Sequence, residues 1–219
     1  IGQFLNAIGL PTLQGYGLTE TSPVVSCNPI HKIRVETVGP PFKGNQVKIA
    51  EDGEILVKGE NVMIGYWNKK EDTEKVIKDG WLYTGDIGEI NPNDGYLKIT
   101  DRKKDIIVTA GGDNISPAKI ENQLLNFPAI DQCLVFGDGK NYLVALIVPN
   151  KEFKEQKEKI NEIIKKINNN LTLVEKVKKF HLVNENFSIE NGLLTPTMKV
   201  KRNKVINKYK NILENFYKN

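Results

Sequence analysis

The stretch DRKKDIIVTAGGDNISP, Asp101–Pro117, marks a change of pattern and decides how this chain is organised. It begins with a five-residue charge run, Asp101–Asp105, which we interpret as a domain boundary. The residues that follow predict two short strands around a Gly111-Gly112 turn, and Pro117 is suited to open a helix that continues to about Asn126. The stretch therefore divides a β-rich part of the chain from a mixed α+β part.

The part before the boundary alternates apolar and polar residues between glycine-rich turns, a pattern that is typical of short β-strands. We expect strands in QVKIAEDGEILVKG, WLYTGDIGEI and GYLKIT, with hairpin turns at Glu51-Asp52-Gly53 and Asn93-Asp94-Gly95. Between two of these strands, NKKEDTEKVIKDG predicts a short helix that ends at Gly80. Residues 1–100 are therefore expected to form the end of one domain, β-rich from about residue 37.

The part after the boundary, residues 101–219, is expected to form a second domain of α+β class. QCLVFG and YLVALIVP predict apolar strands on either side of DGKN. From Lys151 to about Asn170, four isoleucines at helical spacing predict an amphipathic helix whose apolar stripe packs in the core. A last helix is predicted from about Arg202 to Tyr217.

Composition limits the classes of function. The chain has 219 residues, of which 39% are hydrophobic and 26% charged, as in an ordinary globular protein. A net charge of +4 is compatible with a phosphorylated ligand but is too small for a dedicated nucleic-acid binder, so we expect no nucleic-acid partner. The two cysteines, Cys27 and Cys133, match no metal or disulfide spacing, which indicates a reducing compartment.

Two motifs in the first part carry groups suited to a nucleotide. In QGYGLTET, Gln14–Thr21, two glycines flank Tyr16 and allow close backbone approach to a ligand. The adjacent Thr19 and Glu20 offer a hydroxyl and a carboxylate, hard oxygen ligands for Mg²⁺ on phosphates. In YTGDIG, Asp86 ends a β-patterned run, where its carboxylate can accept hydrogen bonds from two ribose hydroxyls. A plain loop and a turn aspartate are the alternatives.

A third motif, LTPTMKVKRNK at Leu194–Lys204, gathers cationic side chains behind a Thr-Pro-Thr turn. Taken alone, such a run favours a solvated basic helix face over a chemical role.

Five stretches in one order, YGLTE, GEILVKGENVMIGYW, YTGD, DRKKDIIVTAGGDNISPAKIE and LTPTMKVKR, resemble the adenylate-forming enzymes. This superfamily comprises acyl-CoA synthetases, luciferases and peptide-synthetase adenylation domains. The last motif is similar to that of long-chain fatty acyl-CoA synthetases. The resemblance implies the β-rich end of a large N-terminal AMP-binding domain, followed by a small mobile α+β C-terminal domain. It also implies ligation of a fatty acid to coenzyme A through acyl-AMP, with release of pyrophosphate.

The resemblance implies roles for residues at matching positions. Gln14, Gly15 and Tyr16 would line the adenine side, with Gly17 in the same nucleotide motif. Thr19 would contact the phosphates of ATP, and Glu20 would hold Mg²⁺. Asp86 would accept from the ribose hydroxyls, and Arg102 would donate to them.

The resemblance assigns further roles to the second part. Lys199 matches the catalytic lysine that meets charge on the α-phosphate, whereas Lys201, Arg202 and Lys204 keep the interpretation of a solvated helix start. Lys104 matches the hinge about which the small domain rotates. Counting from Arg102 selects Gly111, and counting back from Glu121 selects Gly112, as the glycine that lines the pantetheine tunnel.

The phosphate-binding loop of the family, a Ser/Thr/Gly-rich stretch that ends in lysine, does not occur in this sequence. We therefore expect the chain to be the C-terminal part of a longer enzyme and to be inactive by itself. Its expected location is cytoplasmic, with peripheral membrane association of the full enzyme left open, and its oligomeric state is not indicated. Two alternatives stay open: another acyl- or aryl-adenylating ligase, and a non-catalytic domain that binds a nucleotide or an acidic partner.

Overall fold

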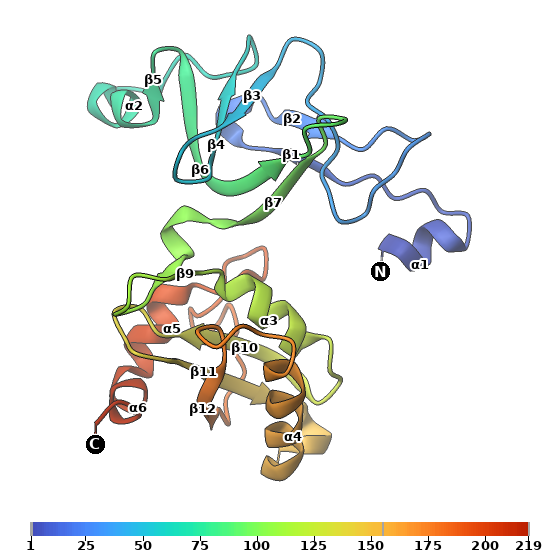
Figure 1. Ribbon diagram of the computed structural model, residues 1–219. Helices are drawn as coiled ribbons and strands as arrows, with labels where there is room; N and C mark the ends of the chain where they lie inside the picture. The colour runs from blue at the N-terminus through green and yellow to red at the C-terminus, as the bar shows by residue number, and fades with distance from the viewer. Residues whose placement is uncertain (1, 155, 219) are drawn as a thin grey trace. The chain divides into compact units, whose positions relative to one another are not determined.

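The computed structural model describes residues 2–154 and 156–218 and consists of two compact units, Ile1–Lys104 and Asp105–Asn219 (Figure 1). The boundary lies four residues later than the expected 100/101, because the strand β7, Leu97–Arg102, continues its pairing through Arg102. Both units combine helices and strands, which confirms the α+β class. Within the described ranges, no helix has both the length and the apolar character that crossing a bilayer requires.

The first unit is built on an antiparallel sheet of order β3-β4-β6-β5, with β7 paired to β6. A separate two-stranded ladder joins β1 to β2. A small core of Val25, Ile55, Val57 and Leu97 fixes the curled sheet. Besides β7, the elements are α1 (Gly2–Ala7), β1 (Gly15–Gly17), η1 (Thr19–Thr21), β2 (Val24–Cys27), β3 (Gln46–Ile49), β4 (Glu54–Lys58), α2 (Lys70–Val76), β5 (Ile77–Lys78) and β6 (Trp81–Ile90).

The predicted hairpins of the first unit are confirmed, but the predicted helix end at Gly80 is wrong. The helix α2 stops at Val76, and Ile77–Lys78 pair with Trp81 and Leu82 of β6. Asp79 and Gly80 have φ values of 52° and 76°. Positive φ at both central residues matches the twist of the flanking strands, so Asp-Gly makes a two-residue hairpin here rather than a helix cap.

The second unit has a three-stranded sheet of order β10-β11-β12, in which β11 is antiparallel to β10 and parallel to β12. All seven residues of β11 are buried. Helices α3 and α4 supply one core cluster, and α5 and α6 supply a second. The elements are η2 (Lys103–Asp105, across the boundary), β8 (Ile107–Val108), β9 (Asn114–Ile115), α3 (Pro117–Leu125), β10 (Ile130–Phe136), β11 (Leu143–Pro149), η3 (Lys151–Phe153), α4 (Lys157–Asn168), β12 (Val177–Leu182), α5 (Arg202–Lys208) and α6 (Lys210–Asn215).

Two helix predictions in the second unit need correction. The amphipathic helix begins at Lys157 rather than Lys151, because the Asn150 side chain accepts from the backbone of Glu152 and caps a separate short 3₁₀ turn. The last helix is interrupted at Tyr209, whose φ of −101° and ψ of 15° are not helical. The isoleucine stripe of α4 is buried in the core, as predicted: Ile160, Ile163, Ile164 and Ile167.

Candidate active site

The first unit brings three residues of the predicted nucleotide site together: Tyr16 and Arg102 both contact the carboxylate of Asp86. The Asp86 side chain is 7% exposed. Tyr16, from β1, donates its hydroxyl to Asp86 Oδ2 at 2.7 Å. Arg102 donates from Nε to Asp86 Oδ1 at 2.8 Å, and its side chain remains 49% exposed. Asp86 and Arg102 are register partners in the β6–β7 ladder, so the sheet itself places the carboxylate beside the guanidinium.

The backbone before Asp86 is held by the hydroxyl of Thr84. The Thr84 hydroxyl donates to the carbonyl of Ile55 at 2.7 Å and accepts from the Asp86 backbone N–H at 3.1 Å. Burial raises the pKa of the Tyr16 phenol well above its ordinary value, and its hydrogen bond to Asp86 raises that pKa further. Tyr16 therefore stays protonated at neutral pH and donates its hydroxyl to Asp86.

Gly17 has a structural explanation that sequence reasoning did not foresee. A Cβ at this position would lie 1.7 Å from the carbonyl oxygen of Pro23, the residue immediately before the paired strand β2. The missing side chain thus admits the chain's own backbone. Gly15 is similar but less tight, since a Cβ there would lie 3.2 Å from the carbonyl oxygen of Ser26. Gln14 accepts the backbone N–H of Asn28 at 2.9 Å, so it also lies in this hairpin.

Glu20 lies on η1, next to the exposed Thr19. Its carboxylate accepts the hydroxyl of Tyr66 at 2.8 Å, and its backbone carbonyl accepts the N–H of Met63 at 2.8 Å. The second carboxylate oxygen has no hydrogen bond to any part of the chain that the structure describes. One carboxylate with an adjacent hydroxyl fits Mg²⁺, which commonly takes one or two protein carboxylates together with substrate phosphates.

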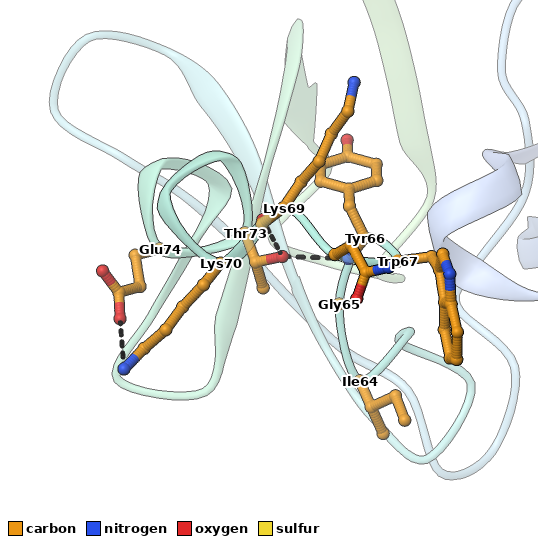
Figure 2. Close-up of a pocket in the computed structure, with 9 residues that line it drawn as sticks. Ile64, Gly65, Tyr66, Trp67, Lys69, Lys70, Thr73 and Glu74 are labelled. Atoms are coloured by element: carbon orange, nitrogen blue, oxygen red, sulfur yellow. Dashed lines mark hydrogen bonds and ion pairs between the residues drawn. The ribbon is translucent and has the colours of Figure 1, made fainter.

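Tyr66 borders a hollow of about 700 Å³ formed by Ile64–Lys70, Thr73 and Glu74. Figure 2 shows the Thr73 hydroxyl between the Tyr66 backbone N–H and the Lys69 carbonyl, both at 2.9 Å. This contact fixes the segment that carries the tyrosine. The role of Tyr66 was not predicted, although it lies inside the quoted stretch GEILVKGENVMIGYW. No cluster of three or more His, Cys, Asp or Glu suited to a metal occurs among residues 2–154 and 156–218.

Lys199 lies in the second unit, on a tight loop closed by an antiparallel bridge between Leu194 and Val200. Thr195 closes the loop from both sides, donating its N–H to the Lys199 carbonyl at 2.8 Å and accepting the Lys199 N–H on its hydroxyl at 3.0 Å. The Lys199 side chain is exposed and has no hydrogen bond or ion pair within the described part of the chain. It is thus free to meet a ligand.

Arg202 corrects the expectation of a solvated helix start. It donates to Glu121 Oε1 at 2.6 Å and to the carbonyl of Val135 at 2.7 Å, and both ionic side chains are 16% exposed. Glu121 also accepts the N–H of Val135 at 2.7 Å. The pair thus binds both the N–H and the carbonyl of Val135 on β10, and so ties the start of α5, just after the Lys199 loop, to that strand. Lys204 is exposed and Lys201 half-buried.

The two glycines of the β8–β9 turn differ in their backbone. Gly112 has a φ of +86°, in the left-handed region that favours glycine, and donates its N–H to Thr109. Gly111 has no such requirement, and a Cβ there would lie 3.3 Å from Asp113 Oδ2. Both are exposed, as is Lys104 on η2. Only Gly112 is therefore explained by the turn itself.

Comparison with known proteins agrees with these motifs. Residues 1–67 match the family described as AMP-binding enzyme, and residues 104–219 match the family described as AMP-binding enzyme C-terminal domain. This chain belongs to the AMP-binding enzyme family. The second structural unit begins at Asp105, one residue after the start of the matched C-terminal domain at residue 104.

Relatives of this AMP-binding enzyme chain include ligases of fatty acids. The chain is 39% identical over 239 residues to "Long-chain-fatty-acid--CoA ligase FadD15" of Mycobacterium bovis, which covers 99% of this chain and 40% of that protein. It is 36% identical over 258 residues to "Probable acyl-activating enzyme 16, chloroplastic" of Arabidopsis thaliana, and this match covers 100% of this chain and 36% of that protein. The chain thus spans about two fifths of the length of such curated relatives.

Solved structures show the same fold. O-succinylbenzoate coenzyme A synthetase from Bacillus subtilis, in complex with AMP, has a TM-score of 0.77 and 29% identity, covering 93% of this chain and 42% of that chain. The adenylation domain of a carboxylate reductase from Mycobacterium chelonae has a TM-score of 0.82 and 25% identity, and the match covers 99% of this chain and 36% of that chain. The predicted fold of an adenylate-forming enzyme is confirmed.

Proposed function

We propose that this chain is the C-terminal portion of an AMP-forming long-chain fatty acid–CoA ligase. The whole enzyme would join a fatty acid to ATP, giving acyl-AMP and pyrophosphate, and then transfer the acyl group to the thiol of coenzyme A. The observation that carries the proposal is the buried Asp86 carboxylate, held between Arg102 and Tyr16, the latter inside the region that matches the AMP-binding enzyme family. The fatty-acid ligases among the relatives support the substrate class.

The nucleotide ribose would bind at Asp86. Within the described residues, Tyr16 donates to one carboxylate oxygen and Arg102 to the other, and a carboxylate has about four acceptor positions, which leaves room for the ribose hydroxyls. Arg102 uses Nε on Asp86 and has a half-exposed guanidinium that can donate to the same sugar. The Tyr16 ring, with Gln14 and Gly15 beside it, would cover the adenine.

The phosphates would lie at the Thr19 hydroxyl, and Glu20 would hold Mg²⁺ through its oxygen that Tyr66 does not occupy. When bound, the metal would neutralise charge on the phosphates. Lys199 would place its ammonium near the α-phosphate, where the attacking carboxylate builds negative charge. Its lack of a partner within the described residues leaves this cation available for that task.

The second reaction would depend on the second unit. Rotation about Lys104 would bring the β8–β9 turn to the pantetheine arm of coenzyme A. Of the two glycines, we assign the tunnel to Gly111. Its absent side chain is not required by its backbone, whereas Gly112 is already explained by a left-handed φ.

The expected location is cytoplasmic, with the whole enzyme associating peripherally with membranes. The support is chemical, because a fatty acid substrate partitions into bilayers. Flotation of the whole enzyme with lipid vesicles, with and without palmitate, tests this assignment, and absence from the vesicle fraction in both cases would contradict it.

The test of the proposed function is ATP–pyrophosphate exchange by the whole enzyme that contains this chain. Palmitate should stimulate exchange, and Asp86→Asn should raise the KM for ATP while leaving the KM for palmitate unchanged. Stimulation by an aryl acid but not by palmitate would favour another adenylating ligase. Exchange with neither acid would favour a non-catalytic binding domain.

A further inference from the structure

The β6–β7 ladder ends at the pair that we assign to the nucleotide. Asp86 and Arg102 are its last partners, and the next two residues, Gly85 and Lys103, cannot continue it. Gly85 has a φ of +72°, and Lys103 begins the 3₁₀ turn η2. An open ladder end leaves backbone groups to be satisfied by other means and lets the two strands splay. Thr84 and the pairing of β6 with β4 hold the Asp86 side of this end, but neither of them joins it to the chain that follows Arg102.

Glu54, the first residue of β4, occupies this open end. Its Oε1 accepts the backbone N–H of Gly85 at 2.8 Å, and its Oε2 accepts the ammonium of Lys103 at 2.8 Å. One carboxylate thus joins the residue immediately before Asp86 to the residue immediately after Arg102. These two contacts connect the ends of β6 and β7 where the backbone pairing has stopped.

Burial makes Glu54 different from its neighbour Asp52, which also contacts Lys103. The Glu54 side chain is 5% exposed, whereas that of Asp52 is 52% exposed at 2.6 Å from the same ammonium. A buried carboxylate needs a cation and hydrogen bonds to remain ionised, while an exposed pair is screened by water. The hydrogen bonds from Lys103 to Asp52 and then to Glu54 raise the Lys103 pKa to about 12, so the cation persists at neutral pH.

We propose that Glu54 is a positioning residue for the nucleotide pair, holding Asp86 and Arg102 opposite each other through Gly85 and Lys103. The proposal rests on the proposed function in one respect, the assignment of the ribose to Asp86 and Arg102. Glu54 acts on β6 through the backbone N–H of Gly85, and on β7 through the side chain of Lys103, the residue that follows this strand.

The first test measures the bond itself in the 219-residue chain. Amide hydrogen exchange of Gly85 should become about tenfold faster or more in Glu54→Gln, because a neutral amide accepts this N–H less strongly than a buried carboxylate does. Asp52→Asn is the matched control, since it removes a charge from the same lysine at an exposed position and should leave Gly85 unchanged. Equal exchange in Glu54→Gln and the unaltered chain would overturn the proposal.

The second test separates positioning from simple stabilisation in the whole enzyme. Lys103→Met should raise the KM for ATP several-fold without changing the KM for palmitate, and Lys103→Arg, which keeps the cation, should restore it. Both Lys103 variants keep the Glu54 side chain and its hydrogen bond from the Gly85 N–H, so they remain informative if Glu54→Gln does not fold. A lowered melting temperature with both KM values unchanged would mean that Glu54 and Lys103 only stabilise the fold, and would contradict the proposal. If the unaltered enzyme adenylates no acid, the proposed function fails, and Gly85 exchange alone decides the role of Glu54 in ordering the ladder end.

Discussion

Replacing Arg202 by methionine should destabilise the second unit although the residue lies in a run of solvated lysines. Methionine keeps much of the side-chain volume but removes the guanidinium. Two charge-assisted hydrogen bonds disappear, to Glu121 and to the carbonyl of Val135, and both partners are left in a region where the ionic side chains are 16% exposed. The change therefore leaves the mostly buried carboxylate of Glu121 and the carbonyl of Val135 without their hydrogen-bond donor from residue 202.

The magnitude follows from these contacts. A hydrogen bond to a charged group contributes about 1.5–3 kcal/mol, and removing one partner of a buried pair costs about 3–5 kcal/mol. Partial exposure lets water replace some of the loss, so we expect about 2–4 kcal/mol in the free energy of unfolding. For a domain of this size that corresponds to a fall in Tm of about 10 °C. Lys204→Met, at an exposed position on the same helix, should stay within about 0.5 kcal/mol of the unaltered chain.

The assay can use the distribution of tryptophans. Both tryptophans of the chain, Trp67 and Trp81, belong to the first unit. Their fluorescence follows unfolding of that unit, whereas far-ultraviolet circular dichroism follows both units. In urea, Arg202→Met should shift the circular dichroism transition to lower denaturant concentration and leave the fluorescence transition in place. A shift no larger than that of Lys204→Met would refute the argument and would mean that Arg202 behaves as a solvent-exposed cation.

A variant that carries both Arg202→Met and Glu121→Met should lose less free energy of unfolding than the sum of the two single changes, since no carboxylate is then left unpaired.

Further predictions concern the chemistry and the pH response. Lys199→Ala in the whole enzyme should slow acyl-AMP formation by about a hundredfold and leave thioester formation from supplied acyl-AMP near normal, with Lys201→Ala as the control; equal loss in both half-reactions would contradict the role. Gly112→Leu should lower the melting temperature because of its left-handed φ, whereas Gly111→Leu should chiefly block transfer to coenzyme A; the reverse result would exchange the two assignments. Burial lowers the pKa of His181, so the unfolded chain binds this proton more tightly and stability should fall as pH drops below 6.5; His181→Gln should flatten urea midpoints between about pH 7 and pH 5, and an unchanged slope would count against this.

Much of the fold was accessible from the sequence because its signals are local. Alternation in β3 and in parts of β6 reflects a more buried and a more exposed sheet face, whereas the first four residues of β4 are buried on both faces, and the glycine-containing turns require particular φ values. Pro117 opens α3 as expected, and the Ser116 hydroxyl accepts from the backbone of Lys119. The isoleucine stripe of α4 indicated its buried face in the same way. The order of the motifs was sufficient to indicate the family.

Where the sequence misled, two local signals competed. Asp79-Gly80 can end a helix or turn a hairpin, and pairing with β6 selected the hairpin. The lysine-rich β12 has little alternation, so its parallel pairing with β11 was not predicted. In both cases the deciding hydrogen bonds come from another strand, which a window of neighbouring residues does not contain.

The chemistry shows the same division more sharply. The motifs around Tyr16 and Asp86 predicted a nucleotide site, and the family resemblance added Arg102; a carboxylate and a guanidinium suit these roles because their hydrogen-bonding abilities are fixed wherever they occur. Which of them meet, and what holds them, was decided by the tertiary structure. The same is true of Tyr66 on Glu20, Glu54 at the open ladder end and the burial of Arg202. An ion pair acquires its strength from burial and partners, and both arise only when segments far apart in the chain pack together.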